Sequence, residues 1–164
     1  YPQLKEVISN LNVKSILDLG CGINPIALSS KEIKYFAYHI NSLDLDIVKK
    51  FFKKNKIHGE IFQIDLRKTD NLSLPETDLC LMFKILDMID KKGHKQAEKI
   101  INKVKSNFLL ISFSTKTLSG KPMNHPQRGW IELLLSRLNF SFQIIKDRNE
   151  IYYLANKNLL TNLE

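Results

Sequence analysis

The stretch at residues 18–22, DLGCG, places an acid and two glycines directly after an apolar run. Glycine lets the backbone turn sharply and lets a ligand approach without meeting a Cβ atom. Pro25 stands where a dinucleotide fingerprint has its third glycine, so the stretch does not fit the pattern that cradles a pyrophosphate. An acid with two glycines suits a cationic, phosphate-free nucleoside such as S-adenosylmethionine. The alternative is a plain glycine turn of another α/β protein.

Further side chains are expected to line the same ligand. The end of the second strand of such a fold normally carries a carboxylate that bonds ribose hydroxyls. Here His39 and Asn41 stand at that place, with Asp44 three residues on as a substitute. After the third expected strand, Asp65 offers a polar contact to an adenine and Leu66 an apolar wall.

An alternating framework must bring these side chains together. Apolar residues spaced i, i+3, i+4, i+7 predict helices, and short apolar runs predict strands. The expected strands are residues 14–19, 35–40, 60–64, 78–83, 108–113, 140–145 and 151–155. The expected helices are 4–11, one beginning at Pro25, 44–54, 97–104 and 131–138. This order predicts an α/β fold with a mostly parallel seven-stranded sheet, helices on both faces and a closing hairpin that supplies an antiparallel edge strand.

Length and composition restrict the class of protein. The 164 residues suit one domain, and the formal charge of +8 favours an anionic partner, nucleic acid first, unless lysine simply serves as a solubiliser. No apolar run is long enough to span a membrane. His39, His58 and His94 lack ligand-like spacing, so we expect no metal. Two lone cysteines fit a reducing, cytoplasmic setting.

Four segments carry a family resemblance: LDLGCGINPIAL, YFAYHIN, LMFKIL and LLISFSTKTLSGK. Together they resemble the ribosomal RNA methyltransferases of aminoglycoside resistance, which methylate N7 of a guanine in the small-subunit decoding site. The resemblance implies a Rossmann-like class I methyltransferase fold that uses S-adenosylmethionine and releases S-adenosylhomocysteine. It also implies ribosomal RNA or the small ribosomal subunit as partner. The family's Asp-Ile-Asp is His-Ile-Asn at residues 39–41 of this chain, and its Ser-Phe-Pro is Ser-Phe-Ser at 112–114.

The resemblance also assigns roles to individual residues. The cofactor site it implies is built from Gly20, Gly22, Asn41, Asp65, Leu66 and Lys84. Further residues expected at this site are Asp18, Cys21, Asn24, His39 and Phe83. The residues expected to position the target are Lys84, Ser112 and Lys116, and those expected to contact RNA are Lys116, Ser119, Lys121 and Arg128. Family members carry an N-terminal RNA-docking domain. We expect it to be absent here, with residues 1–13 forming a helix before a single methyltransferase domain that is a monomer.

The chemistry expected of this site needs no general base. N7 of guanine carries a lone pair and no proton, so correct positioning supplies most of the acceleration. Two alternatives stay open. One is a methyltransferase that acts on a small molecule or a protein. The other is a non-catalytic module that binds RNA or a nucleoside and has a lapsed cofactor site, which His39 and Asn41 favour.

Overall fold

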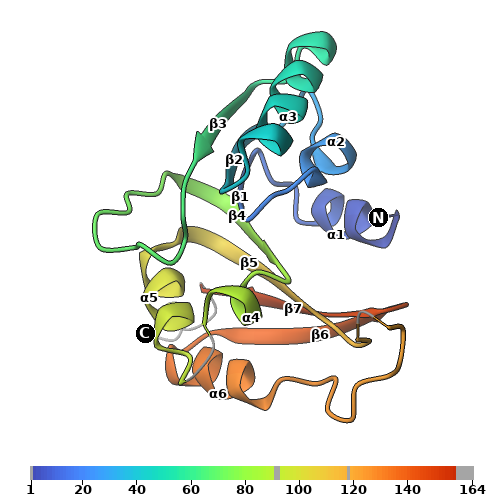
Figure 1. Cartoon of the computed structure of the whole chain (residues 1–164), viewed down its shortest axis with the longest axis vertical. Helices are drawn as coiled ribbons and strands as arrows, with labels where there is room; N and C mark the ends of the chain where they lie inside the picture. Colours follow the sequence, from blue (N-terminus) through green and yellow to red (C-terminus); the bar gives the residue numbers. More distant parts are fainter. Residues whose placement is uncertain (1, 91–92, 118, 158–164) are drawn as a thin grey trace.

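The computed structural model describes residues 2–90, 93–117 and 119–157, in which a seven-stranded sheet runs through the molecule (Figure 1). The strands are β1 (Ser15–Leu19), β2 (Lys34–His39), β3 (Gly59–Gln63), β4 (Glu76–Phe83), β5 (Lys105–Ser114), β6 (Ser141–Asp147) and β7 (Glu150–Asn156). The helices are α1 (Pro2–Asn10), α2 (Asn24–Leu28), α3 (Ser42–Asn55), α4 (Leu86–Ile89), α5 (Lys95–Lys103) and α6 (Gly129–Arg137).

The strand order is β3-β2-β1-β4-β5-β7-β6. Strands β1 to β5 run parallel, and β7 is antiparallel to both of its neighbours. The chain winds outward from β1 through β2 to β3 and then returns to β4 on the other side of β1. The winding therefore reverses between β1 and β4. In open α/β sheets, ligands bind outside the carboxyl ends of the strands at this point.

Helices cover both faces of the sheet, so its central strands are buried on both sides. Leu17 and Leu19 of β1 pack in a cluster with apolar residues of α5 and α6. Ile16, one position along, packs on the opposite face in a cluster with residues of α1, α2 and α3. Figure 1 shows these two helical layers on either side of the sheet. In the described residues, no helix has the length and apolarity needed to cross a membrane.

The expected strands, the mostly parallel sheet and the closing hairpin are confirmed, with two differences. Helix α4, with four residues, was not expected from the sequence. The antiparallel strand is also not at the edge, because β7 lies between β5 and β6. Burial explains this placement. The five interior positions of β7 are all buried, whereas exposed and half-buried positions alternate along most of β6, the edge strand.

Candidate functional site

The turn after β1 is fastened to β2 by two hydrogen bonds. The backbone N–H groups of Gly20 and Cys21 both donate to the carbonyl of Tyr38, at 2.8 and 3.0 Å. Gly20 has φ +77°, and a Cβ there would lie 2.9 Å from the side chain of Ile85. Gly22 has φ +49°, and a Cβ there would have no described atom within 4 Å. Packing therefore requires the first glycine, whereas the second faces open space that a ligand can enter.

Several of the expected cofactor residues have side chains inside the core. The carboxylate of Asp18 is buried and accepts a hydrogen bond of 2.7 Å from the hydroxyl of Tyr35. Burial raises the pKa of Asp18 to about 7, although hydrogen bonds from Tyr35 and Asn24 oppose the rise. Cys21 and Phe83 are also buried. The side chains of Asp18, Cys21 and Phe83 therefore support the turn and the sheet edge from inside the core.

The end of β2 presents a polar pair and an exposed apolar side chain. Nε2 of His39 lies 3.1 Å from Oδ2 of Asp44, so Asp44 anchors the imidazole. Asn41 caps α3, since its Oδ1 accepts a hydrogen bond of 2.9 Å from the N–H of Leu43. Ile40, which the sequence pattern did not single out, is 51% exposed. Its position between two polar residues at a strand end is the signal that could have identified it.

At the end of β3, Asp65 already has a cationic partner. Arg67 donates to both carboxylate oxygens, from Nε to Oδ1 and from Nη2 to Oδ2, each at 2.8 Å. These hydrogen bonds lower the pKa of Asp65 to about 2. Leu66 is buried in the core beside it.

This edge of the sheet has groups suited to contact with a nucleoside. It offers open space at Gly22, an exposed apolar side chain at Ile40, an amide at Asn41 and a carboxylate at Asp65. Within residues 2–90, 93–117 and 119–157, no three side chains of the metal-binding types gather into a possible metal site.

A second cluster follows along the same edge, at β4, β5 and β7. Lys84 lies directly after β4 with φ +55°, and its backbone N–H donates to the carbonyl of Ser112 at 2.9 Å. A non-glycine residue in this conformation is strained, and such strain is concentrated at functional sites. Nζ of Lys84 donates to Glu150 at 3.0 Å, and the hydroxyl of Ser112 donates to the same carboxylate at 2.9 Å. The structure thus joins two expected target-positioning residues through Glu150, which the sequence pattern did not reveal.

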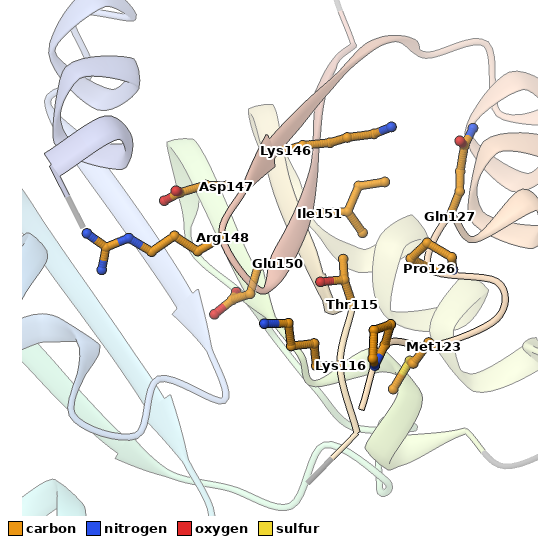
Figure 2. Close-up of a pocket in the computed structure, with 11 residues that line it drawn as sticks. Thr115, Lys116, Met123, Pro126, Gln127, Lys146, Asp147, Arg148, Glu150 and Ile151 are labelled. Carbon is orange, nitrogen blue, oxygen red and sulfur yellow. The ribbon is translucent and has the colours of Figure 1, made fainter. Parts of the chain in front are cut away.

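A cleft of about 350 Å³ lies beside Glu150. Figure 2 shows that its lining comes from the segment around Lys116 on one side and from the β6–β7 hairpin on the other. Lys116, Lys146 and Arg148 contribute positive charge, and Glu150 and Asp147 contribute negative charge. Pro122, Met123, Pro126 and Ile151 add apolar surface. A cleft with this lining can hold a planar base and a phosphate together.

The four expected RNA contacts do not share one environment. Lys116 lines the cleft, and Lys121 and Ser119 are exposed on the turn that follows it. The side chain of Arg128, in contrast, is 14% exposed. Its guanidinium is bonded to Asp87 and to backbone carbonyls of the same loop. Arg128 therefore anchors the loop, while the two lysines remain available to a phosphate.

Known proteins are similar to this chain in sequence. The family model described as "Ribosomal RNA methyltransferase (FmrO)" matches residues 1–153. A 16S rRNA (guanine(1405)-N(7))-methyltransferase of Proteus mirabilis is 28% identical over 151 residues, which are 87% of this chain and 53% of that protein. A similar enzyme of Serratia marcescens is 25% identical over 88% of this chain and 58% of its own length. The chain thus spans little more than half the length of these curated relatives.

Solved structures share the fold. The 16S rRNA methyltransferase RmtF in complex with S-adenosyl-L-homocysteine has a TM-score of 0.78 at 20% identity, over 94% of this chain and 61% of that one. The 16S rRNA methylase RmtB has a TM-score of 0.75 at 19% identity, over 96% and 61%. The match of the family model over residues 1–153 shows that the chain belongs to the ribosomal RNA methyltransferase (FmrO) family.

Proposed function

We propose that this chain transfers a methyl group from S-adenosylmethionine to N7 of a guanine in small-subunit ribosomal RNA. The observation that carries the proposal is the glycine turn at the reversal of the sheet, with open space at Gly22 beside the exposed Ile40. The membership of the chain in a ribosomal RNA methyltransferase family supports the same activity. The named activity of the relatives supports guanine N7 as the target.

In this proposal, the residues at the carboxyl ends of β1, β2 and β3 hold the cofactor. Gly22 lets its amino-acid end approach the backbone, Asn41 bonds the ribose, and Ile40 and Asp65 contact the adenine. The bound cofactor supplies an activated methyl group on a sulfonium.

Lys84, Ser112 and Glu150 lie along the edge beyond this site, where they can hold the target base. The lone pair of N7 would take the methyl group that the bound sulfonium would supply, and sulfur would keep the electron pair of the broken carbon–sulfur bond. No proton leaves the base, so no residue has to act as a general base. Holding the two reacting atoms about 3–3.5 Å apart is then the main contribution of the chain.

The partner in this proposal is ribosomal RNA or the small ribosomal subunit. The chain acts on it in the cytoplasm, as a monomer. The formal charge of +8 and the exposed lysines of the segment around Lys116 favour contact with phosphates. Phosphate contacts fix the orientation of a bound nucleic acid, and base contacts then select the target.

The test is to incubate 30S subunits with the chain and methyl-labelled S-adenosylmethionine, and then to map modified nucleosides by mass spectrometry. The expected result is label in 7-methylguanine at one position of the small-subunit RNA. Label in another base, in protein or in no product would overturn the proposal.

A second candidate is a nucleoside- or RNA-binding module without catalysis. The observation that favours it is the His-Ile-Asn at residues 39–41, where the family has two carboxylates, together with the engagement of His39 by Asp44. Calorimetry with S-adenosylmethionine separates the two candidates. Micromolar binding supports the enzyme, and no binding at millimolar cofactor supports the module.

A further inference from the structure

Glu150 still has acceptor positions for a ligand. Its Oε1 accepts from Lys84 at 3.0 Å, and its Oε2 accepts from Ser112 at 2.9 Å. A carboxylate has about four acceptor positions, so roughly two remain. The side chain is 16% exposed and lines the cleft. Glu150 is therefore a largely buried acceptor, held in a fixed position, with access to a bound molecule.

The strand order fixes the sequence of chemical groups along this edge of the sheet. The strands follow one another as β1, β4, β5 and β7. The glycine turn follows β1, Lys84 follows β4, and Glu150 begins β7. A base that extends from the cofactor turn toward the cleft therefore meets an ammonium first and a carboxylate second.

The perimeter of guanine matches this order. Going round the ring from N7, the base presents the acceptor O6, then the donor N1–H and then the donor 2-amino group. With N7 toward the glycine turn, O6 faces Lys84, and the two donors face Glu150. We propose that Lys84 and Glu150 together read the Watson–Crick edge of the target guanine; this inference rests on the proposed function.

The same arrangement rejects adenine. In that orientation the 6-amino donor of adenine faces the ammonium of Lys84, and its N1 acceptor faces the carboxylate of Glu150. The first contact then sets donor against donor and the second sets acceptor against acceptor, so neither forms a hydrogen bond, and a site built to hydrogen-bond one base rejects the other. The pair thus provides selectivity by attraction to guanine and by repulsion of adenine.

Glu150 also favours the reaction itself. Methylation at N7 leaves the base with a positive charge, and a carboxylate held against N1–H stabilises that charge as it develops. A charged group that is fixed before the reaction is effective because it does not have to reorganise. Ser112 and Lys84 provide this fixation through their hydrogen bonds to the carboxylate.

The first test compares Glu150→Gln with the unmodified chain on 30S subunits. The variant keeps the shape of the side chain but replaces one acceptor with a donor. Since a bidentate contact to a base contributes about 1–3 kcal/mol of discrimination, we expect methyl transfer to fall roughly five- to 150-fold. The matched control is Glu60→Gln, which removes the carboxylate from a Lys34–Glu60 pair of 2.9 Å at the other end of the sheet. The control should keep full activity.

The second test separates base reading from a structural role. RNA is prepared with inosine, which lacks the 2-amino group, at the target position, and both cofactor-free binding and methyl transfer are measured. The unmodified chain should prefer guanine over inosine, and Glu150→Gln should lose this preference. If Glu150 had a purely structural role, Glu150→Gln would reduce binding and methyl transfer equally for the guanine and the inosine substrate. That result would overturn the inference.

A third variant, Lys84→Met, tests the inference if Glu150→Gln does not fold. We expect Lys84→Met to fold because the side chain of Lys84 is 48% exposed. It should lose the preference for guanine over 2-aminopurine, which lacks O6. If the unmodified chain forms no 7-methylguanine, the proposed function and this inference fall together. If it forms 7-methylguanine and both variants keep its base preferences, only the reading of the base by Lys84 and Glu150 is overturned.

Discussion

Asn41 holds the first turn of α3 to the end of β2, because its Oδ1 accepts a hydrogen bond of 2.9 Å from the backbone N–H of Leu43. The amide Nδ2 remains as the group that can meet a ligand. Aspartate caps a helix as well as asparagine does. The structure therefore tolerates either residue at this position, and the choice between them sets the charge at the proposed ribose site.

Asn41→Asp should bind S-adenosylmethionine about tenfold more tightly, since a carboxylate accepts hydrogen bonds from both ribose hydroxyls and charge-assisted hydrogen bonds are stronger than neutral ones. Calorimetry measures the affinity. The comparison variant, Asn41→Ala, loses the cap, and its free energy of unfolding should fall by about 1 kcal/mol. Unchanged or weaker binding by Asn41→Asp would remove Asn41 from the ribose site.

Alanine at the two glycines of the turn should have different effects. Gly20→Ala places a Cβ 2.9 Å from Ile85 at φ +77°, so the main result should be a loss of stability of more than about 1 kcal/mol. Gly22→Ala meets no described atom within 4 Å and should cost about 1 kcal/mol of strain. Its added methyl enters the space expected for the cofactor. Thermal unfolding and calorimetry together should show a folded Gly22→Ala that binds S-adenosylmethionine at least tenfold more weakly.

The buried carboxyl of Asp18 should make stability depend on pH. Its pKa is about 7 in the folded chain and 3.8 when the side chain is fully solvated, as in the unfolded chain, so between these values only the folded chain retains the proton. The free energy of unfolding should therefore fall as pH rises from about 4 to about 7 and then level off.

Asp18→Asn keeps an acceptor for the hydroxyl of Tyr35 but does not titrate. It should match the unmodified chain near pH 4 and exceed its stability at pH 8, by at most about 4 kcal/mol, since one pKa unit corresponds to about 1.4 kcal/mol. Denaturant titrations at pH 4 to 8 measure the difference. The exposed Asp46→Asn serves as control, and parallel profiles of Asp18→Asn and the unmodified chain would contradict the expectation.

Lys116→Ala and Lys121→Ala should each weaken RNA binding and leave the affinity for S-adenosylmethionine unchanged. Each lost phosphate contact should reduce the slope of log K against log salt concentration by roughly 0.7 to 0.9. Binding to a small-subunit RNA fragment between 50 and 200 mM salt, roughly the range over which such contacts weaken, measures this slope. Lys49→Ala, on the exposed side of α3, is the control. A slope equal to that of the unmodified chain would remove the lysine from the RNA interface.

Local patterns predicted most of the fold, because the buried central strands are continuous apolar runs and the helices have apolar stripes. Helix α4 was missed because four residues are too few to show a period. The placement of β7 inside the sheet depends on pairing with β5, which no local pattern encodes.

The same distinction holds for the site. Gly20 and Gly22 stood out in the sequence because glycine allows a sharp turn without a Cβ atom, and both have a positive φ in the structure. Glu150 was not singled out because its hydrogen bond to Ser112 forms only when β7 lies beside β5. Arg128 was expected to meet phosphate because a sequence does not show that neighbouring carbonyls and Asp87 already occupy its donors.

The antiparallel course of β7 also determines when this site is completed during synthesis. A strand that runs against its neighbours brings its first residue, Glu150, to the edge where they end. The nascent chain must extrude β7 to its last residue before this strand can settle between β5 and β6. The half proposed to hold the donor can thus form before β7 is made. The half proposed to select the base can assemble only after β7 has been extruded.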